Sequence, residues 1–152
     1  MHVTAIFIIE GKIEKYVKLN LQEVVFVMQQ LQFEVSWEKA IAKQDRQHIE
    51  TIFNETKHVS DSDILCSPIR EAINHKEALL VTVLVHNFTD NPLAFHNVRM
   101  LYSVHGEVMA DKSFNIPALL IPAKVSMPWT FIFPKGSYKR QTAFENGRLE
   151  IV

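Results

Sequence analysis

The sequence has a single cysteine, four glycines and no long hydrophobic run, and each shortage excludes a class of protein. One thiol, that of Cys66, forms neither an intramolecular disulfide nor a site with several thiolate ligands, and it fits a reducing compartment. The glycines are scattered, at positions 11, 106, 136 and 147. Phosphate-binding loops need clustered glycines that let backbone N–H groups approach the anion, so nucleotide-dependent activity is not expected.

Neither sign of charge dominates. Sixteen basic and seventeen acidic residues give a net charge of -1, which provides no general attraction to nucleic acid or anionic lipid. The apolar stretches 3–9 and 24–28 are far shorter than the roughly 20 residues that cross a bilayer. Charged residues follow the first stretch, whereas a signal peptide carries them in front. We therefore expect a cytoplasmic protein without membrane insertion.

Residues 36–58 are expected to form the main helical region. Ser36 is a suitable N-cap, and apolar residues recur at helical spacing around Ile49 and Phe53. A break is expected near residues 42–44. Lys57 and His58 are expected in the last turn, where the helix dipole favours positive charge.

From Leu65 the period changes to two, which predicts strands. Residues 79–86 are expected to form a strand with one wholly apolar face. A second strand is expected to present Val98, Met100, Tyr102 and Val104 on one side. A tight reversal at His105-Gly106 then leads into a strand over 107–114 that presents Val108, Ala110 and Phe114 on one side.

A segment interrupted by Pro117, Pro122 and Pro128 follows, and then Trp129, Phe131 and Phe133 alternate with smaller residues. Several short strands separated by turn signals predict a β-sandwich or a strongly curved antiparallel sheet. With the helical region in front, the fold class is α+β. Trp129, Phe131 and Phe133 are more typical of a core face, but any of them that is exposed is a candidate protein-contact residue.

Seven histidines raise the question of a metal site. His48 is not part of an HExxH-type pattern, and His58, Asp61 and Asp63 are also ordinary residues at the end of a helix. His75, His96 and His105 fall at predicted turns. We therefore expect no metal site and no cofactor.

Catalytic and nucleic-acid-binding patterns are weak. Cys66 is expected to be a packing residue, and no serine lies in a G-x-S-x-G elbow, so no catalytic residue is assigned. Basic residues gather near the end of the chain, with Tyr138 and Phe144 between them: Lys135, Lys139, Arg140 and Arg148. Such a mixture binds single strands in some proteins, but Glu145 and Glu150 dilute it and favour a solvated tail.

Several segments together carry a family resemblance: 44–46 leading into 49–56, the strand LLVTVLVHN at 79–87, and Ile-Pro at 116–117 and 121–122. The most distinctive is SMPWTFIFP at 126–134. On these motifs, residues 30–140 resemble the SLAP domain family, which is named after S-layer assembly proteins that work with an accessory Sec secretion system. The resemblance implies an immunoglobulin-like β-sandwich with an N-terminal helical segment and no catalytic residues.

The resemblance also divides the chain into an N-terminal extension, 1–27, and a single SLAP-like domain, 28–152. The extension is expected to add a strand and a helix that cap the domain, with 3–9 pairing with a sheet edge. Gln22-Glu23-Val24 can be encoded by CAG GAG GTN, a purine-rich sequence suited to ribosome binding. One hypothesis is therefore that translation starts at Met28, and the alternative is a genuine extension.

The leading functional hypothesis is a non-enzymatic cytoplasmic module that binds another protein as an accessory to the assembly and export of S-layer or surface proteins. The alternative is a small regulatory domain that binds a ligand or metal between helix and sheet. No feature of the sequence identifies the partner or the oligomeric state.

Overall fold

The computed structural model describes residues 2–9, 12–20, 28–59, 62–140 and 145–152. Strands β1 (His2–Ile9) and β2 (Lys12–Asn20) pair with each other in an antiparallel hairpin. The sequence predicted a strand and a helix here, with 3–9 on a sheet edge. That prediction was wrong, because 12–20 is a second strand and β1 takes it as its partner.

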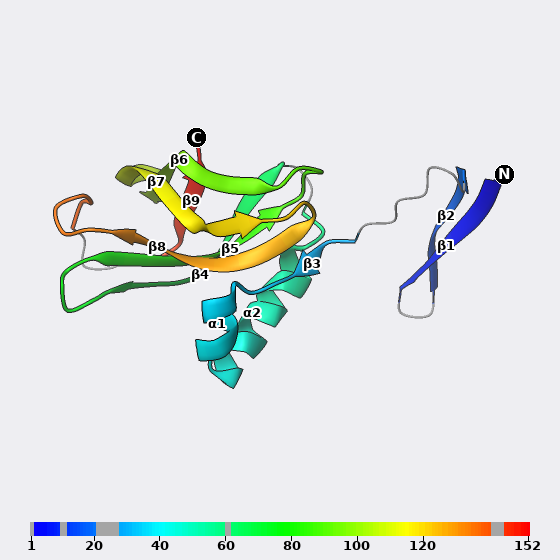
Figure 1. Cartoon of the computed structure of the whole chain (residues 1–152), viewed down its shortest axis with the longest axis horizontal. Helices are drawn as coiled ribbons and strands as arrows, with labels where there is room; N and C mark the ends of the chain where they lie inside the picture. Colours follow the sequence, from blue (N-terminus) through cyan, green and yellow to red (C-terminus); the bar gives the residue numbers. More distant parts are fainter. Residues whose placement is uncertain (1, 10–11, 21–27, 60–61, 141–144) are drawn as a thin grey trace.

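Strands dominate the remainder of the described chain, and two helices stand near its start (Figure 1). The helices are α1 (Val35–Ala40) and α2 (Lys43–Thr56). The strands are β3 (Gln30–Leu31), β4 (Ile64–Ile73), β5 (Leu79–Asn87), β6 (Leu93–Val104), β7 (Glu107–Ile121), β8 (Val125–Phe133) and β9 (Gly147–Ile151). No helix in the described ranges has the length and hydrophobicity needed to span a bilayer.

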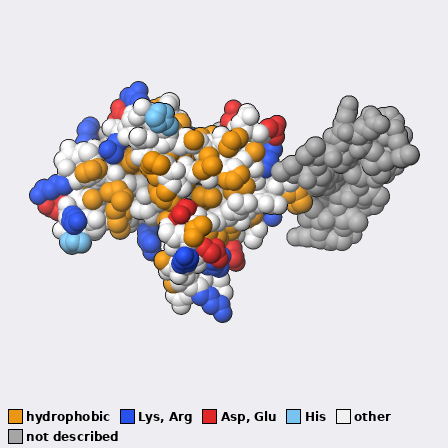
Figure 2. All heavy atoms as spheres, viewed as in Figure 1, with side chains coloured by type: hydrophobic (Ala, Val, Ile, Leu, Met, Phe, Trp, Pro, Cys, Tyr) orange, Lys and Arg blue, Asp and Glu red, His pale blue; other side chains and the backbone are white. Residues whose placement is uncertain are grey.

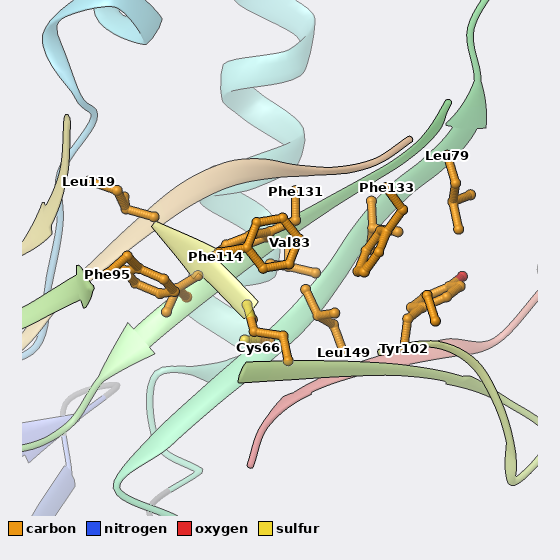
Figure 3. Close-up of a cluster of buried hydrophobic side chains, with 14 of the residues drawn as sticks. Cys66, Leu79, Val83, Phe95, Tyr102, Phe114, Leu119, Phe131, Phe133 and Leu149 are labelled. Carbon is orange, nitrogen blue, oxygen red and sulfur yellow. The ribbon is translucent and has the colours of Figure 1, made fainter. Parts of the chain in front are cut away.

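These strands form two sheets around one core. One sheet has the order β3-β8-β5-β4 and the other β7-β6-β9; every pairing is antiparallel except that of β3 with β8. Figure 3 shows side chains from both sheets meeting between them, where Phe114 of β7 lies edge-on to Phe131 and Phe133 of β8, with centroids 5.2 and 5.3 Å apart. The expected β-sandwich is therefore supported in its layers.

Strand β5 matches its predicted alternation. Leu79, Val81, Val83 and Val85 belong to the core between the sheets, and Leu84 packs on the opposite side with Ile49 and Phe53 of α2. Both helices lie on this outer side of the β3-β8-β5-β4 sheet, away from β6, β7 and β9 (Figure 1). They cover only one end of the sheet face.

The predicted helix breaks where expected, because α1 ends at Ala40 and α2 begins at Lys43. Its two ends differ from the prediction. The N-cap is Glu34, whose carboxylate accepts a hydrogen bond from the Ser36 N–H at 2.9 Å, so Ser36 is not the cap. At the other end α2 stops at Thr56, and Lys57 is the C-cap rather than part of the last turn.

The reversal at His105-Gly106 is confirmed, with φ of 51° and 81°, the left-handed values that a two-residue hairpin turn of type I′ requires. The face predicted for the next strand was partly wrong. A register shift between Tyr102 and Ser103 buries both Met109 and Ala110 and leaves Val108 exposed.

The proline-interrupted segment also differs from prediction, because β7 continues through Pro117 to Ile121. Strand β7 lies at the edge of its sheet, and an edge strand tolerates a residue that lacks a backbone N–H.

Candidate functional site

A hollow lies where the two helices meet the outer face of the sheet. It has a volume of about 590 Å³. Its lining comes from the two helices and the link between them, and from β4 and β5: Ser36, Trp37, Ala40, Ile41, Ala42, Asp45, His48, Ile49, Ile69, Arg70 and Thr82. We call this hollow the seam groove. Its size falls in the range of small-molecule and cofactor sites, about 300 to 1,000 Å³.

The helical wall of the groove is formed by the break between the helices. Ile41 caps α1 with an extended backbone, and its N–H donates to the Trp37 carbonyl at 2.9 Å. Trp37 and Ile41 pack against the small cluster of Ile49, Phe53 and Leu84 and remain half-buried. Helix α1 has only six residues and buries none of them, so the Trp37 side chain lines the groove while keeping part of its surface exposed.

The sheet wall is formed by an irregularity in β4. Pro68 pairs with Val83 and Arg70 pairs with Thr82, so Ile69 is one residue more than the neighbouring strand has. Such a bulge changes where side chains point. As a result two consecutive residues, Ile69 and Arg70, both line the groove, although consecutive residues of a regular strand face opposite ways.

A buried polar cluster on the same sheet face fixes the helices beside the groove. Its centre is His86, which is 0% exposed. The Nδ1 atom lies 2.6 Å from Ser126 Oγ, and Nε2 lies 2.8 Å from Thr56 Oγ1 at the end of α2 and 3.2 Å from Ser67 Oγ of β4. The Phe88 ring stacks on the imidazole, with centroids 5.1 Å apart.

The hydrogen-bond partners assign the tautomer of this histidine. Thr56 Oγ1 donates to the Ile52 carbonyl at 2.6 Å, so it accepts from His86 Nε2–H. Ser126 Oγ accepts from the Gln29 amide at 2.9 Å and donates to His86 Nδ1. The imidazole is thus neutral, and its burial lowers the pKa of His86 to about 4.

The cluster contains a serine beside a histidine, which is the pairing of a nucleophile and a base. Both Ser126 and His86 are 0% exposed, and neither lines the seam groove. A substrate therefore has no approach to them in this structure, and the cluster joins α2 to β4, β5 and β8.

The predicted packing role of Cys66 agrees with its surroundings. Its side chain is buried in the core between the sheets (Figure 3), and burial raises the pKa of the Cys66 thiol to about 12. At that pKa the thiolate, which is the reactive form, is scarce near neutral pH.

The described histidines and acidic residues do not gather into a group that could hold a metal ion. No group of three or more potential metal ligands occurs among the residues that the structure describes. Asp61, which the sequence placed near His58 and Asp63, lies outside the described residues.

The basic residues near the end of the chain are paired with acids. Lys135 and Arg140 both contact Glu77, Lys139 lies 3.2 Å from Glu107, and Arg148 lies 3.4 Å from Glu150. Tyr138 donates to the Glu77 carbonyl at 2.8 Å. Phe144 lies outside the described residues.

The three candidate protein-contact residues separate in the structure. Phe131 and Phe133 are 0% exposed and belong to the core, so within this fold they offer no contact surface. Trp129 is half-buried against the same core and keeps part of its ring accessible. Of the three, only Trp129 remains a candidate for contact with another protein.

Sequence reasoning missed the residues of the seam groove, Trp37 and Arg70 above all. The predicted break near residues 42–44 was the one local signal. It implies a short helix before the break, and Trp37 lies on that helix, which buries none of its residues. The sequence hypothesis of a ligand or metal site between helix and sheet refers to the same region, and it stays a prediction.

Comparison with known proteins gives one match. A family model described as the SLAP domain matches residues 31–150, which includes both helices and all of β4 to β8. No curated protein and no solved structure matches the chain.

Proposed function

This chain belongs to the SLAP domain family, and from that premise we propose that it is a non-enzymatic module that binds a hydrophobic segment of another protein in the seam groove. The observation that carries the proposal is Trp37, a half-buried aromatic residue that lines the groove together with Ile41, Ile49 and Ile69. Aromatic residues in apolar pockets provide much of the binding energy of protein interfaces.

The apolar surface continues beyond the groove, on the part of the sheet that the helices leave uncovered. Ala72, Leu80 and Ile132 lie side by side on β4, β5 and β8, and Ile132 is 50% exposed. Figure 2 also shows hydrophobic side chains at the surface of the sandwich, with acidic and basic ones interspersed. An apolar strip of three residues beside a groove suits a chain segment better than a compact ligand.

The chemistry of the other groups supports a role in binding. The thiol of Cys66 and the Ser126–His86 pair are buried, and the basic residues near the end of the chain are neutralised by acids. These features support a module that carries no catalytic centre and does not bind nucleic acid.

Two finer parts of the proposal rest on the family and the strand order. The family resemblance supports an accessory role in the assembly and export of S-layer or surface proteins, carried out in the cytoplasm. The order β4-β5-β8 facing β7-β6-β9 supports an immunoglobulin-like topology. Export is tested by measuring the surface proteins that a deletion strain secretes, and localisation by cell fractionation.

The groove itself is tested by photo-crosslinking in the protein's own host. The photoreactive residue p-benzoylphenylalanine replaces His48, an exposed residue of α2 that lines the groove. The matched control carries it at Glu50, also exposed on α2 but outside the groove. We expect a protein adduct with the His48 variant and not with the Glu50 variant. Equal adducts from both positions, or none from either, contradict the proposal.

A second candidate function is favoured by the size of the groove. About 590 Å³ also suits a small molecule, as in a regulatory domain that binds a ligand between helix and sheet. Native mass spectrometry of protein purified from its host separates the two functions, because a retained small molecule adds a discrete mass that is lost on denaturation.

A further inference from the structure

Arg70 differs from every other arginine of the chain. The sequence has five arginines, and all lie in described residues. Four of them make ion pairs: Arg46 with Glu38, Arg99 with Asp111, Arg140 with Glu77, and Arg148 with Glu150. Within the described chain the guanidinium of Arg70 has neither an ion pair nor a hydrogen bond, and the residue is exposed in the wall of the seam groove.

The position of Arg70 determines what its unpaired guanidinium can bind. The bulge in β4 places it next to Ile69, on the same wall of the groove and opposite the helices. The neighbouring β5 residue, Thr82, is occupied by its own hydrogen bond to Thr130 at 2.8 Å. An arginine on an apolar wall prefers a planar anion, because its fork of N–H groups matches both oxygens of a carboxylate.

We propose that the groove selects an extended peptide segment in which an acidic residue lies next to bulky hydrophobic residues, with Arg70 as the residue that recognises the carboxylate. This inference rests on the proposed function and adds the chemistry of the segment. The hydrophobic side chains contact Trp37, Ile41 and Ile69, and the acidic side chain pairs with Arg70. The carboxylate of Asp45, on the helical wall, disfavours a second acidic residue on that side.

A peptide is a better occupant than a fatty acid because of the shape of the site. Ala40, Ala42, Asp45, His48 and Arg70 all line the groove and are all exposed, so the groove is open to solvent and is not an enclosed cavity. A fatty acid buries its chain in an enclosed cavity, whereas an extended peptide leaves its backbone accessible to water.

The test is a selection from a library of random 12-residue peptides displayed on phage, with the full chain as bait. Arg70→Glu is the second bait, and Arg148→Glu, at an exposed position of strand β9, is the matched control. Because Arg70 has no partner in the described chain, its substitution is expected to leave the urea midpoint unchanged, which is checked first. We expect the wild-type and Arg148→Glu baits to enrich Asp or Glu beside Leu, Ile, Phe or Trp.

With the Arg70→Glu bait we expect that preference to change to Lys or Arg. For the best wild-type peptide, replacing its acidic residue by the amide is expected to weaken binding about tenfold, a typical effect for a hydrogen bond to a charged group. The same replacement is expected to have little effect on binding to Arg70→Gln, because the pair is already broken.

Three results overturn this inference. Hydrophobic peptides enriched without an acidic preference, or with the same preference for Arg70→Glu, remove Arg70 from recognition but leave the proposed function standing. Dodecanoate bound more tightly than any selected peptide, measured by Trp fluorescence, makes the occupant a lipid acid. No enrichment by any bait contradicts a peptide occupant, and the His48 crosslink in the host then decides separately whether a protein binds here.

Discussion

The two faces of strand β5 share one backbone and differ in almost every other respect. On the inner face Leu79, Val81, Val83 and Val85 are buried against aromatic rings from both sheets. On the outer face only the end that carries Leu84 and His86 is covered by the helices, and the rest opens into the seam groove and the uncovered strip. The comparison indicates that the inner face and the covered end of the outer face provide the stability, while the rest of the outer face is available for binding.

The largest expected effect comes from two neighbouring residues of β8 that face opposite ways. Phe131 is 0% exposed in the core and Ile132 is 50% exposed on the outer face. Phe131→Ala is expected to lower the free energy of unfolding by about 3 to 5 kcal/mol, because it leaves a cavity among packed rings. Ile132→Ala is expected to change it by less than about 0.5 kcal/mol. Urea denaturation measures the free energy of unfolding of both variants. Equal losses would show that the two faces of β8 contribute equally to stability.

The next effect concerns pH and the covered end of the outer face. The pKa of His86 falls from 6.5 in the unfolded chain to about 4 in the fold. Below pH 6.5 the unfolded chain binds a proton at His86 that the folded chain does not bind. The stabilisation that the buried, neutral His86 provides is therefore complete above pH 6.5 and is lost as pH falls toward 4. The loss is on the order of 3 kcal/mol. His86→Gln is expected to flatten this part of the stability profile; an unchanged slope would show that other groups cause it.

A smaller effect is expected at Gly147 of β9, which lies against the ring of Tyr102. A Cβ atom here would approach Cε1 of Tyr102 to 2.6 Å, and Tyr102 is 1% exposed. Gly147→Ala is expected to cost about 1 to 3 kcal/mol, as overpacking of a core does. Gly136→Ala is not a suitable control, since its φ of 84° adds strain of its own. Ser113→Ala, at an exposed residue of β7, is suitable and is expected to have little effect on the thermal midpoint.

The smallest effect is expected at the ion pair between the two helices that cover one end of the outer face. Arg46 of α2 lies 2.7 Å from Glu38 of α1 and stacks on the Phe33 ring at 4.5 Å. Glu38→Gln is expected to lower the free energy of unfolding by less than about 1 kcal/mol, because the ion pair is exposed to solvent. A larger loss in thermal denaturation would show that the helices contribute more to stability than the comparison assigns to them.

The residues of the inner face were predicted from the sequence more accurately than those of the outer face, for a physical reason. A period of two is a local property, so the faces of β5 and of Trp129 to Phe133 were visible in the residues themselves. The bulge at Ile69 is not local, because it depends on how β4 pairs with β5. The same holds for Val108, whose exposure follows a register shift, and for His86, whose burial depends on the end of α2.

The seam groove was beyond such reasoning because its walls come from residues 36–49 and 69–82, which meet only in the folded chain. The break between the helices was predicted, but its consequence for Trp37 was not. Arg70 gave no signal in the sequence, since its lack of an ion pair within the described chain is a property of the tertiary structure.

If the seam groove binds a partner and is dispensable for folding, a substitution in its wall is expected to abolish binding without changing stability. Ala40 tests it directly, because it is exposed, lines the groove and leaves room for a longer side chain. The measurement compares Ala40→Gln with Lys39→Gln, its neighbour outside the groove, in the chain that carries the photoreactive residue at position 48. We expect that Ala40→Gln loses the protein adduct and that Lys39→Gln keeps it. The free energies of unfolding of the two variants are expected to lie within about 0.5 kcal/mol of each other. An undiminished adduct with Ala40→Gln would contradict this expectation.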